Sequence, residues 1–162
     1  MKSSLAFRCL LLAELSSVGY SVRLASVQEA CSSIKALAPQ KLFYPQDSAY
    51  ALENTDYYNI GLAELQPACI FQPTSAEEVS AAVKVLNKYN DVPFAVKSGG
   101  HDPNPGHSSV KGGVLIALSK MAYAHYNKVD NTAQFGPGGH WSTVIGPLEK
   151  EGVAVVGGRL GE

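Results

Sequence analysis

Residues 68–97 constrain the fold more than any other part of the chain. The apolar residues 68–71 predict a short strand, and Gln72-Pro73-Thr74 predicts a turn. Ser75-Ala76-Glu77-Glu78 fits a capping box, in which a hydroxyl and a carboxylate accept from free amides at a helix start. Apolar side chains then recur at helical spacing until Asn90-Asp91, and residues 92–97 predict another strand. The pattern predicts an α+β domain that opens with a strand–helix–strand unit.

Weaker patterns flank this unit on both sides. Three further short apolar runs, 113–119, 132–135 and 153–156, predict strands because each is bounded by Gly, Asn or Asp. The last two are separated by a helical face whose Pro147 should keep that helix short or kinked. The segment 26–64 reads as helix and irregular chain. Its aromatic residues are interpreted as packing residues: Phe43, Tyr44, Tyr50, Tyr57 and Tyr58.

Length and charge limit the classes of partner. The 162 residues are 46% hydrophobic, which is enough for one domain-sized core. Thirteen basic and fourteen acidic residues give a net charge of −1, so the phosphate attraction that drives nucleic-acid binding has no source. The apolar stretch 9–15 is too short to span a membrane. We therefore expect no nucleic-acid or membrane partner, and the oligomeric state is left open.

The first 25 residues have two interpretations. Lys2, the apolar residues 5–15 and the small residue Ala25 fit a secretory signal and predict a secreted protein. Arg8 and Glu14 interrupt the apolar centre, which fits an amphipathic first helix or a misassigned start equally well.

The cysteines bear on the same question. Cleavage of the signal would remove Cys9 and leave Cys31 and Cys69 as an even pair, able to form a disulfide in an oxidising compartment. Two buried free thiols are the alternative.

Glycine-rich turns follow several of the predicted strands. Ser98-Gly99-Gly100-His101-Asp102 follows one strand, and its backbone amides are suited to a nest for phosphate, to which Lys97 would add a point charge. Gly136-Pro137-Gly138-Gly139 and Gly157-Gly158 follow two others. Together they predict one shared ligand edge, although each pair alone fits a tight turn.

Several familiar sites are missing from the sequence. It contains no G-x-G-x-x-G fingerprint, no P-loop and no G-x-S-x-G elbow. The three cysteines form no C-x-x-C pair, so we expect no metal site. The histidines are also too irregularly spaced for zinc: His101, His107, His125 and His140.

Residues 65–162 resemble a known family. The runs at 73–79, 96–101, 112–118 and 155–159 are similar, in this order, to the first half of the FAD domain of flavin-linked oxidases. That family includes vanillyl-alcohol oxidase, p-cresol methylhydroxylase and the berberine bridge enzyme branch, whose fungal members the chain resembles most. The resemblance implies the N-terminal half of a two-lobed FAD-binding domain, apparently truncated: a possible signal at 1–25, a helical or irregular segment at 26–64 and a partial FAD-binding domain at 65–162.

The resemblance also implies roles for residues. In the berberine bridge branch, the histidine that matches His101 bonds covalently to the 8α-methyl group of FAD, whereas a surface turn histidine is the alternative reading. Ser98, Gly99, Gly100 and Asp102 would hold the cofactor through backbone groups, and Gly157 and Gly158 would lie against it. Members with two covalent bonds carry a cysteine where this chain has Arg159-Leu160-Gly161, so a single attachment is expected.

Two functions from different classes follow. The first is an FAD-dependent oxidoreductase of the oxidase type, which moves hydride from an alcohol or amine carbon to flavin and then electrons to dioxygen. It would be a fragment without the substrate domain, and the resemblance assigns no catalytic base within it. The alternative is a non-catalytic FAD-binding fragment or gene remnant. A nucleotide-binding module without redox chemistry is a third reading. A truncated sheet should expose an edge strand at 153–156 and favour aggregation.

Overall fold

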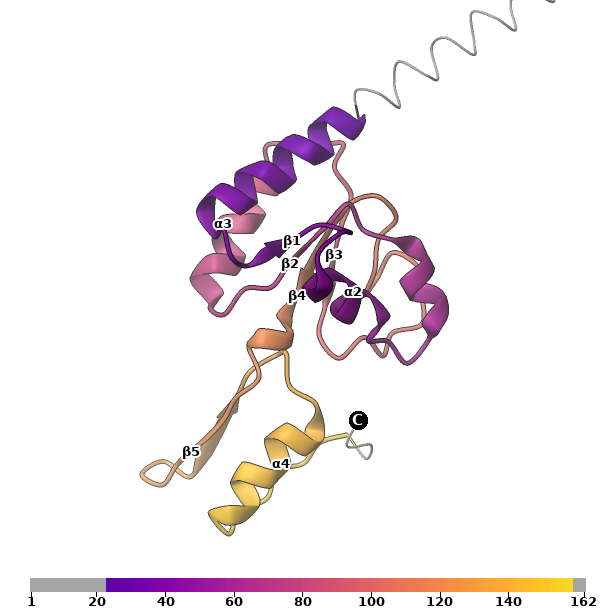
Figure 1. The fold of residues 1–162 in the computed structure, drawn as a ribbon. Helices are drawn as coiled ribbons and strands as arrows, with labels where there is room; N and C mark the ends of the chain where they lie inside the picture. Colours follow the sequence, from indigo (N-terminus) through magenta and orange to yellow (C-terminus); the bar gives the residue numbers. More distant parts are fainter. Residues whose placement is uncertain (1–22, 159–162) are drawn as a thin grey trace, which may run out of the picture.

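The computed structural model describes residues 23–158. Its central sheet has four strands: β1 (Leu42–Phe43), β2 (Cys69–Phe71), β3 (Phe94–Lys97) and β4 (Val114–Ala117). The order across the sheet is β1-β2-β4-β3 (Figure 1). Strands β2 and β3 each pair with β4 in parallel, and β1 joins β2 antiparallel. Within residues 23–158, no helix combines the length and the apolar character needed to cross a membrane.

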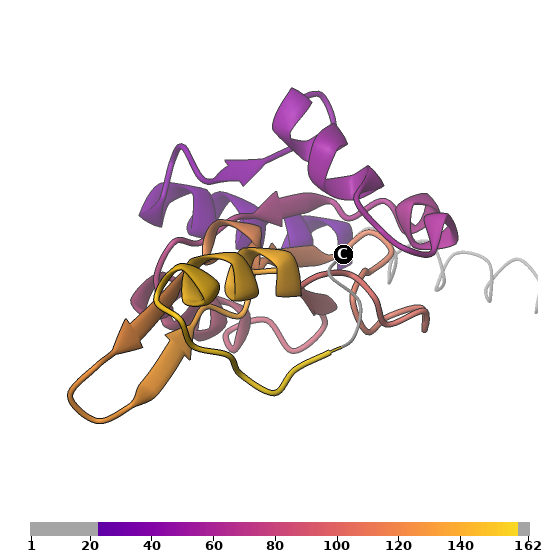
Figure 2. The same ribbon diagram turned by 90° about the horizontal axis from the view of Figure 1, so that it is seen from below.

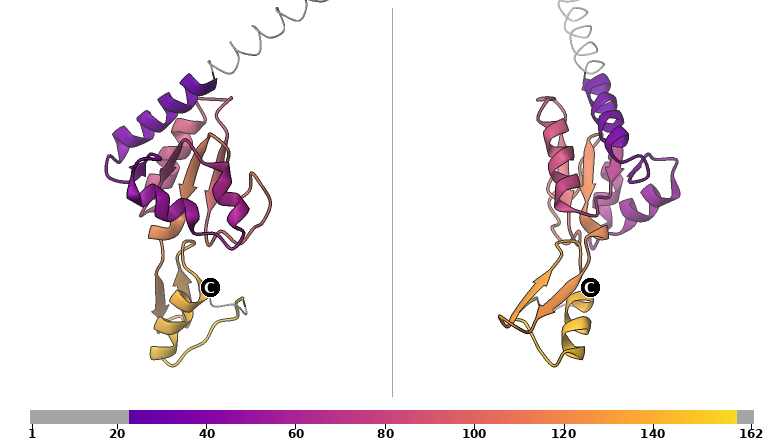
Figure 3. Two further views of the ribbon diagram at one scale, coloured as in Figure 1. Left: turned by 45° about the vertical axis from the view of Figure 1, so that its right-hand side comes forward. Right: turned by 90° about the vertical axis from the view of Figure 1, so that its left-hand side faces the viewer.

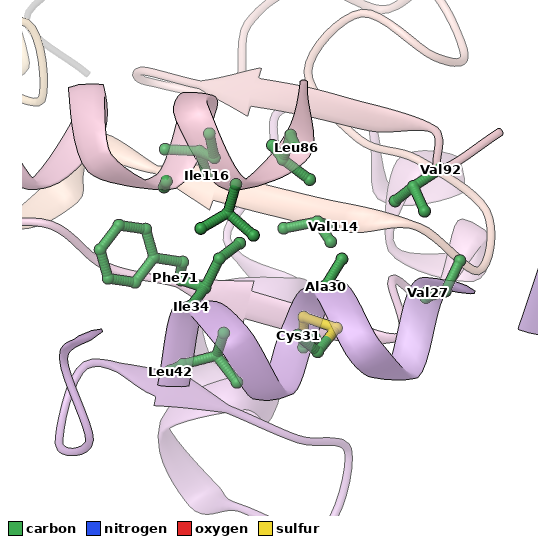
Figure 4. Close-up of a cluster of buried hydrophobic side chains, with 13 residues drawn as sticks. Val27, Ala30, Cys31, Ile34, Leu42, Phe71, Leu86, Val92, Val114 and Ile116 are labelled. Carbon is green, nitrogen blue, oxygen red and sulfur yellow. A yellow bond between two sulfur atoms is a disulfide. The ribbon is translucent and has the colours of Figure 1, made fainter. Parts of the chain in front are cut away.

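Helices cover both faces of this sheet (Figure 1). A helix over residues 23–37 and α3 (Ala76–Leu86) pack on one face. On the other face lie α2 (Ser48–Thr55) and the 3-10 helix η1 (Ile60–Leu65). All four residues of β4 are buried, as expected for a parallel strand covered on both sides. Figure 4 shows the core between the sheet, the helix over residues 23–37 and α3, which includes Ile34, Phe71, Leu86, Val114 and Ile116.

A disulfide bond joins Cys31 of the first helix to Cys69 of β2 (Figure 4). Both residues are buried in the core, and their Cα atoms lie 6.2 Å apart. Of the two alternatives that the sequence left open, the structure has the disulfide. The bond ties the N-terminal helix to the centre of the sheet.

The rest of the chain forms a smaller lobe that extends beyond the sheet (Figures 2 and 3). The 3-10 helix η2 (Leu118–Lys120) leads into an antiparallel hairpin of β5 (Ala124–Asn127) and β6 (Thr132–Phe135). Helix α4 (Trp141–Lys150) packs against β5. Only glycine fits at position 138, because a Cβ atom there would overlap the carbonyl of Leu118.

Most of the predicted elements are confirmed, with differences at their ends. The strands predicted at 68–71, 92–97 and 132–135 are β2, β3 and β6. The strand predicted at 113–119 is β4, and its last two residues belong to η2 instead. Helix α3 stops at Leu86, before the predicted end. Ser75 caps it by accepting from Glu78 N–H, but the Glu78 carboxylate reaches the amide of Thr74, one residue before the capping residue.

One prediction in the smaller lobe is wrong, and another is confirmed in part. Residues 153–156 were expected to form a strand, but they are irregular, since the described chain places no strand beside them, and Val156 is fully exposed. Pro147 was expected to shorten or kink its helix. Helix α4 has ten residues and runs through Pro147 to Lys150, so it is short, as predicted, although it does not end at the proline.

Candidate functional site

The loop that follows β3 is the centre of the candidate site. It begins with Ser98, Gly99 and Gly100, and Gly100 has a positive φ of 69°. A Cβ atom at Gly100 would lie 3.0 Å from both the Cε atom of Lys97 and the Cδ1 atom of Tyr57. Glycine is therefore required there by both backbone conformation and space. The exposed His101 directly follows this turn.

Lys97 does not serve as a point charge for a phosphate, contrary to the expectation from the sequence. It is fully buried, and its Nζ atom lies 2.8 Å from Glu53 Oε1 and 3.6 Å from Asp56 Oδ2. The same ammonium donates to the Glu53 carbonyl at 2.9 Å and lies 4.2 Å from the ring centre of Tyr57. Side chains alternate along a strand, so Lys97 points with Ala95 toward the face that α2 covers.

Glu53 is the centre of a buried polar network beneath the loop. Its carboxylate accepts from Gln72 Nε2 at 2.6 Å and from Ser119 Oγ at 2.7 Å, in addition to Lys97. Burial works against ionisation, but the hydrogen bonds from Lys97, Ser119 and Gln72 and the charge of Lys97 together hold the pKa of Glu53 below its usual value. The network fixes α2, β2, β3 and η2 to one another at the base of the loop.

Asp102 holds the outer part of the loop in shape. Its carboxylate accepts from the Asn104 amide at 2.9 Å and faces His107 Nδ1 at 2.8 Å, while the Ser108 hydroxyl donates to its carbonyl. Hydrogen bonds from Asn104 and His107 lower the pKa of Asp102. The side chain and the carbonyl of Asp102 are thus used within the loop, so the predicted cofactor contact would fall to its backbone amide.

His101 is stacked on Tyr58, a residue of the segment between α2 and η1. The two ring centres are 4.5 Å apart, and the ring planes are inclined by only 10°. Sequence reasoning assigned Tyr57 and Tyr58 to packing and missed this contact. Forty-three positions separate Tyr58 from His101, and no spacing rule predicts a contact over such a distance.

Two of the three glycine-rich turns meet, and the third, which follows no strand, packs on Trp141 of α4. The Ser98 hydroxyl donates to the Pro137 carbonyl, and the His140 ring would lie 3.7 Å from a Cβ atom at Gly99. Gly157 and Gly158 lie so close to the Trp141 ring that a Cβ atom on either would overlap it.

A cavity of about 490 Å³ opens where the first two turns meet. Its lining comes from the turn after β3, the turn after β6 and α4: Ser98, Phe135, Gly136, Pro137, Gly139, Trp141 and Val144. Glycine backbone, a hydroxyl and aromatic surface fit a cofactor that has both a phosphate part and a ring part. Within residues 23–158, no group of three or more His, Cys, Asp or Glu side chains is placed to hold a metal.

Comparison with curated proteins finds fungal flavoenzymes. The chain is 39% identical over 117 residues to an uncharacterized FAD-linked oxidoreductase of Arthroderma benhamiae, covering 72% of this chain and 23% of that protein. It is 35% identical over 138 residues to an FAD-dependent monooxygenase of Emericella nidulans, covering 84% and 29%. The chain thus spans about a quarter of the length of these relatives.

Solved structures and a family model agree with these relatives. A 6-hydroxy-D-nicotine oxidase from Arthrobacter nicotinovorans matches with a TM-score of 0.59 and 26% identity, over 68% of this chain and 23% of that one. The glucose dehydrogenase Phl p 4.0202 has the same fold, with a TM-score of 0.65 and 20% identity over 76% and 26%. The model of the FAD binding domain matches residues 67–158. The chain therefore belongs to the FAD-binding domain family of the vanillyl-alcohol oxidase type.

Proposed function

We propose that the chain forms the FAD-binding part of an oxidoreductase of the oxidase type, in the fungal berberine bridge branch. The observation that carries the proposal is the exposed imidazole of His101, which lies on the glycine loop that borders the cavity. The fungal flavoenzymes among the relatives and the family match over residues 67–158 support it.

Each residue of the loop has a role in the proposal. The backbone groups of Ser98, Gly99, Gly100 and Asp102 bind the pyrophosphate or the ring edge, and Gly157-Gly158 contact the cofactor from the neighbouring segment. His101 supplies the nucleophilic nitrogen for a single covalent bond to the flavin. When bound, FAD supplies the chemistry of hydride acceptance and of electron transfer to dioxygen.

The covalent step balances with dioxygen as the oxidant. A bond would form between the His101 ring nitrogen that carries no hydrogen and the 8α-methyl carbon, while the methyl carbon and the other ring nitrogen would each lose one hydrogen. The two electrons and two protons pass to the flavin ring and then to dioxygen, which becomes hydrogen peroxide. The side chain of His101 is exposed, so its ring nitrogens are open to a bound cofactor.

The substrate class follows from the fold's known members. A 6-hydroxy-D-nicotine oxidase and a glucose dehydrogenase share the fold. We therefore propose a small molecule with an oxidisable alcohol or amine carbon as the substrate.

We further propose that the protein functions outside the cytosol, after secretion. The Cys31–Cys69 disulfide supports this, because disulfides form and persist in oxidising compartments. When the secreted protein is denatured without reductant and treated with a thiol-alkylating reagent, Cys31 and Cys69 should stay unmodified, because a disulfide has no free thiol. Addition at both residues would contradict the proposal.

Denaturing mass spectrometry combined with a visible absorption spectrum tests the attachment. Purified chain incubated with FAD in air should gain one FAD mass and flavin absorbance, and His101→Ala should lose both the mass and the covalent colour. His125→Ala is the matched control, because His125 is an exposed histidine on β5, in the smaller lobe. A wild-type chain at its bare mass that also binds no FAD reversibly would contradict the proposed function.

A further inference from the structure

We propose that Tyr58 is a positioning residue that holds the His101 imidazole in place for flavin attachment, a role that rests on the proposed function of His101. The near-parallel rings, with centres 4.5 Å apart, form the contact. Stacking on a flat ring restricts the torsions of an exposed imidazole, which would otherwise turn freely about two bonds.

The residues on both sides of Tyr58 contact β3 and the loop that follows it. On one side of Tyr58, Asp56 Oδ2 lies 3.6 Å from the buried Lys97 ammonium. The Tyr57 hydroxyl donates to the Ser108 carbonyl at 2.9 Å, and Asn59 Nδ2 donates to the Pro103 carbonyl at 3.4 Å. The residues before and after Tyr58 are therefore both bonded to the loop, so the Tyr58 ring has a fixed base.

Burial does not account for the position of Tyr58. The residue is 78% exposed, so its ring contributes little to the core, whereas Tyr57 beside it is partly buried. A ring that is held at the surface by its neighbours and that faces another exposed ring gains no comparable hydrophobic free energy. Its distinct contribution is the orientation of His101.

The stack also leaves the reactive atoms accessible. Both imidazole nitrogens lie in the ring plane, so a partner that covers one face of the ring leaves its edge free for attack. A fixed nucleophile close to its target reacts faster because less rotational freedom is lost in the reaction. The interaction uses the face of the tyrosine ring, so phenylalanine should replace it.

The test uses Tyr58→Ala and Tyr58→Phe. Tyr123→Ala is the matched control, because Tyr123 stacks on His125 in the smaller lobe with ring centres 5.4 Å apart. The first readout is the NMR shift of the His101 ring protons in the chain without FAD. We expect Tyr58→Ala to remove the ring-current shift, Tyr58→Phe to keep it, and Tyr123→Ala to leave it unchanged.

The second readout is the rate at which the FAD mass appears in denaturing mass spectra. Tyr58→Ala should attach FAD about tenfold more slowly or worse, with reversible FAD affinity and unfolding midpoint unchanged, and Tyr58→Phe should restore the rate. Attachment by Tyr58→Ala at the wild-type rate would overturn the role of Tyr58 while leaving that of His101 intact. Equal slowing in Tyr58→Phe would overturn the stacking. A wild-type chain that never gains the mass would overturn attachment through His101, and the positioning role with it.

Discussion

At the scale of single residues, Lys97 carries a buried charge beneath the loop, and its ammonium is paired with the Glu53 carboxylate. Lys97→Met should lower the free energy of unfolding by roughly 3–5 kcal/mol, since it leaves the Glu53 carboxylate buried without its cation. Urea unfolding followed by circular dichroism measures this change.

Two further variants separate charge burial from packing. Lys97→Met combined with Glu53→Leu should recover much of the loss, because no unpaired charge then remains. Lys128→Met removes an exposed ion pair with Glu151 and should change stability little. Equal effects of Lys97→Met and Lys128→Met would contradict this account of the buried pair.

Glu53 also predicts how stability depends on pH. Its folded-state pKa lies below the unfolded value of about 4.3, so the ionised carboxylate stabilises the fold above that pH. The contribution is lost as the pH falls through the folded-state pKa. The gap in unfolding midpoint between wild type and Glu53→Gln should therefore be full at pH 6 and shrink below about pH 4. A difference in unfolding midpoint that grows as the pH falls would contradict a lowered folded-state pKa of Glu53.

At the scale of elements, β3 is an edge strand with apolar residues in solvent. Phe94 and Val96 are 46% and 42% exposed, although they share a face with the buried Val114 and Ile116 of β4. Within the described chain, no strand pairs with the outer side of β3. Such an edge invites pairing with other chains, so the aggregation that the sequence placed at 153–156 is expected at β3 instead.

Val96→Lys should therefore reduce aggregation. A charge on an exposed edge opposes edge-to-edge pairing, and its long stem can reach solvent. Light scattering during storage at fixed concentration measures the effect. Val129→Lys adds the same charge at an exposed position between β5 and β6 and should help less. Equal protection by the two variants would point to net charge rather than to the edge.

Elements with a strong local pattern were the ones that the sequence predicted. Apolar runs between turn residues located β2, β3 and β6, and Ser75 located the start of α3. Strand β5 was missed, because Ala124–Asn127 is polar, lies on the small hairpin and has little buried surface to mark it. The order of strands across the sheet was also not predictable. Strand β4 lies between β2 and β3, although it follows β3 in the chain after a long connection.

At the scale of the whole molecule, the Cys31–Cys69 disulfide ties the first helix to the sheet. The two residues are 38 positions apart, so closing this loop should stabilise the fold by roughly 3–4 kcal/mol through lost freedom of the unfolded chain. Reduction should therefore lower the melting temperature, and Cys31→Ala should behave like the reduced wild type. Calorimetry with and without reductant measures this. An unchanged melting temperature would show that the bond contributes no net stability.

The sequence by itself determined local pieces of this protein: strands β2, β3, β4 and β6, the helix start at Ser75 and the glycine turns whose ordered motifs resemble an FAD-binding family. These follow from spacing and backbone preference, which act over a few residues. Only the tertiary structure decided that Lys97 pairs with Glu53, that Tyr58 faces His101 and that the turns after β3 and β6 border one cavity. Each of these depends on segments far apart in the chain, which are brought together by burial of the two faces of the sheet.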